Sequence, residues 1–399
     1  MEKINKKEML GWMLALTGGT VITMTGQIYE PGMVLVEEGK IVAAGPLDRI
    51  PAGVEVDDVT GYLVMPGFID AHCHVGVAEE IYREEGDDTN EYTDPVTPHL
   101  RAIDAVNPAD LGFEDARSGG VTTVATGPGS ANILGGEMAA LKTAGQVVDR
   151  MVVRAPVGLK AALGENPKRT YAREKKMPAT RMASAALLRE ALAKARDYQR
   201  KLEAAAAGRG EHPGRDLKME ALLPVLRREI PLRVHAHRAD DIMTALRIAR
   251  EFDLLLVVEH CTEGYLVARE LAAYGAMAVV GPVITNRAKV ELKGISLETP
   301  RILAEAGVTF AIMTDHPVVP IQYLALSAAL TLRGGLSEER ALRAITLDAA
   351  RILGLESRLG SLEPGKDADI VVLSGHPFDP RTRVVKTYIE GRLVYLPRP

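Results

Sequence analysis

The chain has few cysteines and few aromatic residues, and it has no long run of one charge or of apolar side chains. Its two cysteines, Cys73 and Cys261, cannot build a disulfide framework, so we expect a reducing, cytoplasmic environment. Aromatic residues make up 4% of the chain and do not alternate with basic ones, which argues against a nucleic-acid partner. The net charge of −5 is spread along the sequence, and no apolar run approaches ~20 residues, so we expect no membrane contact.

Both ends of the chain carry short strand-like segments between glycines. The apolar run over 9–16 follows three lysines, but it is short and continues directly into strand pattern, so we interpret it as mature structure and not as a signal peptide. Neither end has enough strands to close a sheet alone. We therefore predict that residues 1–66 and 359–399 form one small composite β-sandwich domain. The expected strands are 14–16, 21–24, 33–37, 40–44, 368–373, 384–390 and 393–396.

The middle of the chain, residues 67–358, alternates strand-like and helix-like segments. Strands that alternate with helices favour a parallel sheet, and eight of them predict a (β/α)8 TIM barrel, an α/β fold. The stretch near 165–229 is too long for one crossover, and its alanine- and charge-rich part, 182–208, predicts a helical insertion at the surface. The eight expected strands are 67–72, 121–126, 137–141, 152–160, 232–237, 254–260, 276–280 and 308–314.

Histidines and other ionisable residues stand at the predicted strand ends, where a barrel of this kind carries its chemistry. His72 and His74 project from one face of a strand, although with 9 histidines chance alone gives ~0.2 pairs at this spacing. Because strand ends converge, histidines and a carboxylate there can surround a divalent metal, best Zn²⁺ and nearly as well Mn²⁺, Fe²⁺ or Co²⁺. The later strand ends carry Lys160, His235, His237, His260 and Asp315.

Several motifs together resemble the amidohydrolase superfamily, in particular its imidazolonepropionase-related and prolidase-like branches. They are the Pro-Gly-Phe-Ile-Asp-Ala-His-Cys-His segment that ends at His74, the late His260 and Asp315, and the Gly-Ser-Leu-Glu-Pro-Gly-Lys-Asp-Ala-Asp segment over 360–369. The resemblance covers almost the whole chain outside the insertion. It implies a metal-bearing barrel and a β-sandwich built from both chain ends, in agreement with the strand pattern.

The resemblance also implies roles for single residues. His72 and His74 would bind a first metal, and His235 and His260 would bind a second. Asp315 would be both a ligand and the catalytic acid/base. His237 is left for contact with the substrate or with the ligands.

Lys160 decides how many metal ions are expected. Its segment, 157–163, resembles the binuclear subgroup, in which a carboxylated lysine bridges two ions. If Lys160 is not carboxylated, we expect one ion. The alternative is a strand-end lysine that pairs with a substrate carboxylate, with Glu165 as the substitute ligand.

The acidic loop over 79–99 follows the first barrel strand, so it either closes over the substrate, through Asp94 or His99, or forms a solvated loop or subunit contact. The glycine-rich turns at 127–130 and 135–136 match no nucleotide-binding pattern. Cys73 and Cys261 are each adjacent in the sequence to an expected ligand. Because alternation turns them away from the ligand side, we expect both to fill the core.

The expected function is a metal-dependent amidohydrolase that cleaves an amide-type C–N bond in a small molecule: a dipeptide, an N-acyl amino acid or a cyclic amide. One alternative is a mononuclear deaminase or an imidazolonepropionase-like cyclic-imide hydrolase, with its ion on His72, His74, His235 and Asp315. Another is a catalytically silent scaffold, because some superfamily members have lost their metals. The resemblance further implies a homo-oligomer.

Overall fold

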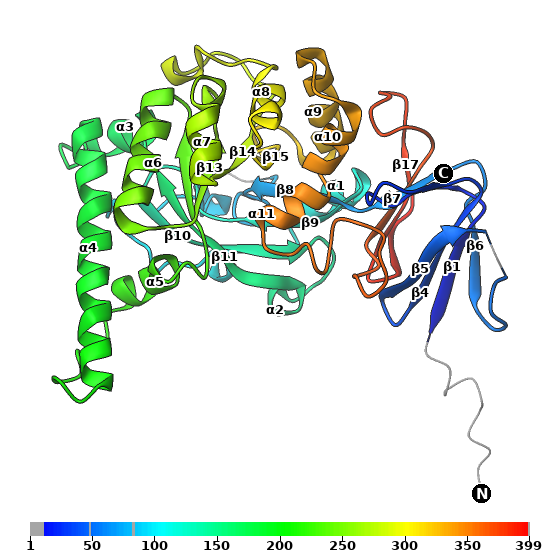
Figure 1. The fold of residues 1–399 in the computed structure, drawn as a ribbon, viewed down its shortest axis with the longest axis horizontal. Helices are drawn as coiled ribbons and strands as arrows, with labels where there is room; N and C mark the ends of the chain where they lie inside the picture. The colour runs from blue at the N-terminus through cyan, green and yellow to red at the C-terminus, as the bar shows by residue number, and fades with distance from the viewer. Residues whose placement is uncertain (1–11, 48, 82–83, 398–399) are drawn as a thin grey trace, which may run out of the picture.

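The computed structural model describes residues 12–47, 49–81 and 84–397. The first part of the apolar run at 9–16 lies outside these residues, and its later part belongs to strand β1 (Met13–Thr17). The described chain folds into a barrel with helices around it and two further sheets at one side (Figure 1). No helix within the described ranges is both long and apolar enough to cross a membrane.

One eight-stranded sheet forms the barrel, and it confirms the predicted (β/α)8 fold. All of its strands fall within or beside the predicted segments. Most neighbours are parallel, but β10 runs antiparallel to both β9 and β11, which corrects the expectation of a parallel sheet throughout. Parallel neighbours need a crossover of about a dozen residues or more, whereas only 127–133 separate β9 from β10. In bonding order the strands are β8 (Phe68–Cys73), β9 (Val121–Thr126), β10 (Leu134–Lys142), β11 (Val152–Ala162), β12 (Leu232–Ala236), β13 (Leu256–His260), β14 (Met277–Val280) and β15 (Phe310–Ile312).

Helices cover the outside of the barrel. The long α4 (Arg181–Ala206) stands at its outer edge and extends beyond it, beside α5 (Leu217–Leu226), as expected for the insertion (Figure 1). Thr180 caps α4 by accepting the N–H of Ala183, which fixes where the helix begins. The other helices are α1 (Leu111–Ser118), α2 (Val148–Met151), α3 (Glu165–Arg173), α6 (Ala239–Phe252), α7 (Ala268–Tyr274), α8 (Thr299–Glu305), α9 (Leu324–Thr331), α10 (Glu338–Ala344) and α11 (Leu347–Ile352).

A side chain helps to close the barrel between β8 and β15, beside a backbone bond from the His74 N–H to the His316 carbonyl at 2.9 Å. Asp70, on β8, is fully buried and accepts hydrogen bonds from the Thr314 backbone N–H at 3.1 Å and from the Thr314 hydroxyl at 2.5 Å. Its other oxygen accepts the His72 N–H at 3.1 Å. This carboxylate therefore fixes the segment that carries His72 against the segment that leads into Asp315.

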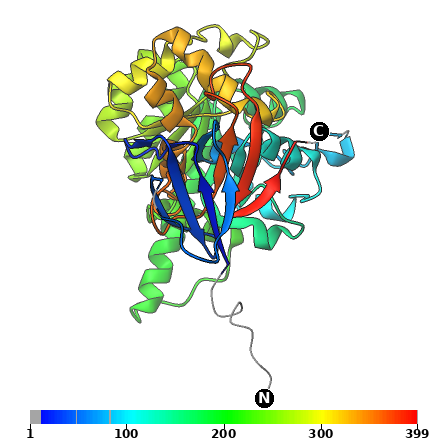
Figure 2. The ribbon, with the colours of Figure 1, turned by 90° about the vertical axis from the view of Figure 1, so that its right-hand side faces the viewer.

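Strands from both chain ends build the two remaining sheets (Figure 2). One sheet is entirely N-terminal, and the other joins β7 to the C-terminal β16 in antiparallel register. Leu16, Val64 and Ile370 share one apolar core between the sheets. The domain boundaries at 66 and 359 remain a prediction. In bonding order the first sheet is β5 (Lys40–Pro46), β4 (Gly32–Glu37), β1 and β6 (Glu55–Asp58), and the second is β18 (Arg392–Tyr395), β17 (Val384–Ile389), β16 (Ile370–Leu373), β7 (Leu63–Pro66), β2 (Thr20–Ile22) and β3 (Ile28–Tyr29).

A buried ion-pair cluster ties the barrel to the terminal sheets. Lys142, at the end of β10, donates to Asp367 at 3.0 Å and to Asp369 at 2.6 Å. Burial alone would raise the pKa of Asp367, but Lys142, Lys40 and Arg358 outweigh it and hold that pKa below its usual value. The 360–369 motif therefore ends in two aspartates that attach the terminal sheets to the barrel.

We predict that Lys142→Met lowers the free energy of unfolding by about 3 kcal/mol, because it leaves two buried carboxylates without their shared cation. Lys194→Met, which breaks an exposed pair with Glu190 on α4, should change it by no more than about 0.5 kcal/mol. Chemical denaturation measures both. The pKa of Asp367 is lowered in the folded state. The difference in free energy of unfolding between wild type and Lys142→Met should therefore be complete above about pH 4 and should shrink as pH falls further. Equal denaturation midpoints for Lys142→Met and Lys194→Met would contradict the prediction.

Candidate functional site

A cavity of about 680 Å³ opens where the barrel strands end. Histidines form its floor, and the loops that follow β8, β9, β11 and β14 form its walls. Its ionisable and amide-bearing lining residues are His74, Asp87, Asn90, Asn166, His235, His237, His260, Asn286, Lys289 and Asp315.

One group of candidate ligands combines β8 with the end of β15. His72, His74 and Asp315 each offer a ligand atom, and these atoms lie within 4.8 Å of one another. Asp315 Oδ1 is 3.2 Å from His72 Nε2 and 3.4 Å from His74 Nε2. The Asp315 backbone has a φ of 55°, a left-handed conformation that costs energy for a residue with a side chain. That turn follows the Thr314 bonds to Asp70 and directs the carboxylate toward both rings.

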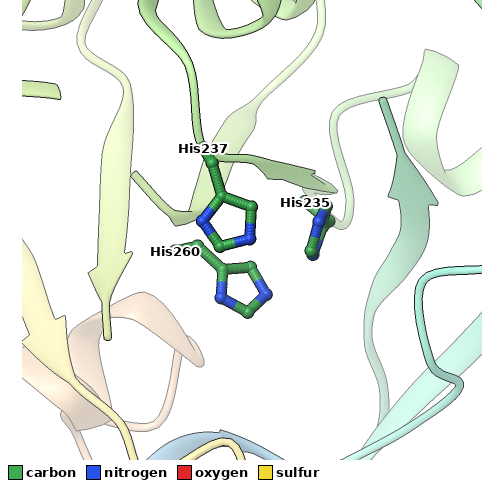
Figure 3. Close-up of side chains that lie close together, drawn as sticks. All are labelled: His235, His237 and His260. Carbon is green, nitrogen blue, oxygen red and sulfur yellow. The ribbon is translucent and has the colours of Figure 1, made fainter. Parts of the chain in front are cut away.

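A second group, His235, His237 and His260, meets the same 4.8 Å limit. Figure 3 shows the three rings facing one common space, two from β12 or its end and one from β13. On β12 the alternation sends Val234 outward among the helices and both histidines inward, as predicted. On β13 the same alternation would send His260 outward with Val258. A φ of 66° at His260 turns its ring back into the cavity.

Each histidine that lines the cavity makes a hydrogen bond within the chain through its Nδ1 atom. His74 Nδ1 lies 2.8 Å from the Gly127 carbonyl, and His260 Nδ1 lies 3.0 Å from the Gly281 carbonyl, so each must donate its proton there. Their Nε2 lone pairs then face the cavity. His237 Nδ1 bonds Thr262 Oγ1 at 2.7 Å and His235 Nδ1 bonds Ser130 Oγ at 2.9 Å. Such outer contacts orient metal-binding imidazoles in proteins.

The electrostatics of these rings suit metal binding. Burial, reinforced by neighbouring histidines, lowers the pKa values of His235, His237 and His260 well below the usual value, so all three are neutral at neutral pH. Burial would raise the pKa of Asp315, but His260, His72 and His74 hold it well below its usual value. The Nε2 atom of His237 is buried without a hydrogen-bond partner. Neutral imidazoles and an ionised carboxylate form a donor set that fits a divalent cation.

A buried carboxylate, Glu259, lies directly beneath these ligands. Its Oε1 is 2.8 Å from Arg233 Nε and 3.0 Å from His72 Nδ1, and its Oε2 accepts from Lys160 Nζ. The side chains of Glu259, Arg233, His72 and Lys160 are all inaccessible to solvent. Lys160 Nζ also lies 3.5 Å from His72 Nε2. Glu259 therefore balances two buried cations and lies against a candidate ligand.

The structure brings most of the predicted site residues together but leaves others apart. His237 lies among the histidines of the second group, and its role in substrate contact remains a prediction. His99 lines a neighbouring cavity with Pro128 and Gly135, and Asp94 pairs with Lys218; neither of them lines the histidine cavity. Asp87, Thr89 and Asn90 are the residues of the 79–99 loop that do.

Glu165, the substitute ligand, begins α3 and lies 3.7 Å from Arg169. Cys73 and Cys261 are buried free thiols, and burial raises the pKa of Cys261 to about 12, so neither is a nucleophile at neutral pH.

The sequence analysis missed Glu259 and Arg233. A signal for both exists: they interrupt apolar strand segments, where an unpaired charge would be too costly.

The model of the amidohydrolase family matches residues 63–394. The chain belongs to the amidohydrolase family. It is 31% identical to the amidohydrolase tasK of Hapsidospora irregularis over 92% of this chain, although it spans only 40% of that protein's length. It is 28% identical to a 5-methylthioadenosine/S-adenosylhomocysteine deaminase of Symbiobacterium thermophilum, over 96% of this chain and 93% of that one.

A solved structure resembles this amidohydrolase across its whole length. An amidohydrolase from Thermotoga maritima MSB8 is 46% identical, with a TM-score of 0.94 over 96% of this chain and 100% of that one. The family resemblance stated from the sequence motifs is thereby confirmed. Family membership and the hydrolase and deaminase relatives identify an enzyme that hydrolyses carbon–nitrogen bonds.

We predict that Glu259→Met destabilises this amidohydrolase by about 3–5 kcal/mol, because it leaves Arg233 and Lys160 as buried, unbalanced cations. The double variant Arg233→Met/Glu259→Met removes one of these cations and should recover part of the loss. Chemical denaturation of metal-free protein gives the comparison. A double variant less stable than the single one would contradict the assigned charge balance.

Proposed function

We propose that this amidohydrolase is a metal-dependent hydrolase of an amide-type C–N bond, with Asp315 as the catalytic acid/base. The observation that carries the proposal is the position of Asp315: its carboxylate lies against His72 and His74 and also lines the histidine cavity. The proposed ligands are His72, His74, His235, His260 and Asp315, joined by Lys160 if it is carboxylated. Zn²⁺ suits this set best, and Mn²⁺, Fe²⁺ or Co²⁺ would also fit.

A bound divalent cation supplies a water of lowered pKa and polarises the substrate carbonyl. The chain's own residues do the rest. Asp315 is ionised, so its free oxygen takes the proton from the attacking water and then delivers it to the leaving nitrogen. The fixed Nδ1 contacts of His74 and His260 keep those rings from turning during this transfer. Asp315 thus returns to its ionised form within one turnover, and the leaving nitrogen departs with the proton.

The cavity supports a small-molecule substrate. Its volume of about 680 Å³ lies in the range of small-ligand pockets. Lys289 and Asp87 line it. Lys289 suits the carboxylate of a dipeptide or an N-acyl amino acid, and Asp87 suits the ammonium group of a dipeptide; a cyclic amide is the other substrate class. Screening these three classes with Zn²⁺ or Mn²⁺ present identifies the substrate. We further propose a homo-oligomer in the cytoplasm, where the free thiols Cys73 and Cys261 would stay reduced.

A one-ion enzyme is the second candidate, either a deaminase or a cyclic-imide hydrolase. The ion pair between Lys160 and Glu259 favours it, because a lysine held as an ammonium cannot bind metal. In the two-ion enzyme Lys160 becomes an anionic carbamate, and Glu259 keeps Arg233 and His72 as partners.

We predict that Asp315→Asn keeps the bound metal but lowers kcat by about 10²–10⁴-fold, because an amide cannot carry the proton. Elemental analysis gives the metal content, and steady-state kinetics on the best substrate of the screen give kcat. Undiminished turnover in this variant would remove Asp315 from the acid/base role.

We predict that Lys160→Ala lowers the metal content from about two ions per chain toward one. Elemental analysis of protein purified without chelators provides the measurement. Two ions in both proteins would exclude a bridging carbamate on Lys160, and one ion in both would favour the one-ion enzyme.

A further inference from the structure

The loop over 127–133, which joins β9 to β10, orients one of the cavity histidines. Its Ser130 Oγ lies 2.9 Å from His235 Nδ1. Contacts of this kind set the direction in which a metal-binding imidazole presents its other nitrogen. The loop contains neither helix nor strand, so its backbone groups need partners elsewhere in the chain. What holds the loop at Ser130 therefore decides how the ring of His235 points.

Two adjacent residues of the loop after β8 bind the backbone on both sides of Ser130. The Gly129 N–H donates to the Thr89 carbonyl at 2.7 Å. The Ala131 N–H donates to Asn90 Oδ1 at 2.9 Å. One of these partners is a side chain, so a single substitution at Asn90 can remove it and leave the backbone bond at Thr89 in place.

The amide of Asn90 is held in the orientation that this contact needs. Its Nδ2 donates to Thr89 Oγ1 at 2.9 Å, and Thr89 Oγ1 in turn donates to Asp87, so the amide oxygen is left to accept the Ala131 N–H. The amide also lies directly against Gly129. A Cβ at Gly129 would be 2.5 Å from Asn90 Nδ2 and 2.7 Å from its Oδ1, so any side chain there would displace the amide.

The far end of the same loop has separate anchors. The Asn132 side chain donates to Thr97 Oγ1 at 2.8 Å and accepts the Tyr171 hydroxyl at 2.6 Å. These contacts fix the point where β10 begins. Removing the Asn90 amide should therefore free the part of the loop that carries Ser130 and leave strand β10 in place.

We propose that Asn90 is a positioning residue of the metal site: through the loop between β9 and β10 it fixes the orientation of His235. The inference deepens the proposed function and rests on its metal dependence. It gives the loop over 79–99 a role other than closing over the substrate or meeting another subunit. Because Asn90 and its neighbours also line the histidine cavity, a substrate in the cavity lies beside the residues that orient a metal ligand.

The test compares Asn90→Ala with Asn107→Ala in the full chain. Asn107 is a matched control: it also accepts a backbone N–H, that of Ala109 at 3.0 Å, and donates to Glu79 of the same loop, but it does not line the histidine cavity. Chelator competition gives the Zn²⁺ dissociation constants, and ¹⁵N NMR of labelled histidines in metal-free protein reports the surroundings of His235 Nδ1. We expect Asn90→Ala to weaken one Zn²⁺ site by about 10-fold or more and to shift the His235 Nδ1 signal, whereas Asn107→Ala leaves both as in wild type.

Two further variants identify the contact that matters. Asn90→Asp keeps an oxygen for the Ala131 N–H and should restore most of the Zn²⁺ affinity; a variant as weak as Asn90→Ala would overturn the inference. Gly129→Ala places a Cβ against the amide. It should weaken Zn²⁺ binding in the wild-type background and have little further effect in Asn90→Ala, because the displaced group is already absent there.

The outcomes separate this inference from the proposed function. If wild type binds no Zn²⁺, the proposed function fails, and the His235 signal alone decides whether Asn90 orients that ring: a shift in Asn90→Ala supports the role and an unchanged signal overturns it. If wild type binds Zn²⁺, the inference requires both changes in Asn90→Ala, and the absence of either overturns it while the proposed function stands. Should Asn90→Ala not fold, Gly129→Ala takes its place under the same criteria.

Discussion

The site depends on the charge pairing of one buried carboxylate, that of Glu259. It faces Arg233, Lys160 and His72, and the side chains of all four residues are inaccessible to solvent. Removing a charge from such a group leaves the others uncompensated in a medium of low dielectric constant. The ring of His72 lies between this carboxylate, 3.0 Å from its Nδ1, and Asp315, 3.2 Å from its Nε2. The same carboxylate thus pairs with the buried cations of the barrel interior and lies against a candidate ligand.

The backbone supplies the second constraint, where the strands end. Regular alternation would direct His260 outward with Val258, and the segment after β15 would run past the cavity. Left-handed backbone at His260 and Asp315 redirects both side chains inward. Such conformations are costly and persist only where surrounding contacts determine them, here Gly281 for His260 and the Thr314 bonds to Asp70 for Asp315.

Much of the fold was predictable because it follows from local pattern. All eight barrel strands were readable as apolar segments, and their ends gave five histidines and Asp315 as a convergent set. The direction of β10 was not, because apolar content does not distinguish parallel from antiparallel pairing. The place of His99 was not predictable either: it lies in the loop beside the site, yet it lines a neighbouring cavity, because the path of a loop is not revealed by a single sequence.

The antiparallel β10 has a consequence for the shape of the site. A strand that runs against its neighbours brings its beginning, and not its end, to the rim of the cavity, so a short loop and not a crossover helix joins β9 to β10. That loop, 127–133, supplies the Gly127 carbonyl to His74 and the Ser130 hydroxyl to His235. One reversed strand thus lets a single loop hold one histidine from each candidate ligand group. Because each contact fixes an Nδ1 atom, that loop sets where both Nε2 atoms point, and the spacing between the two groups depends on it.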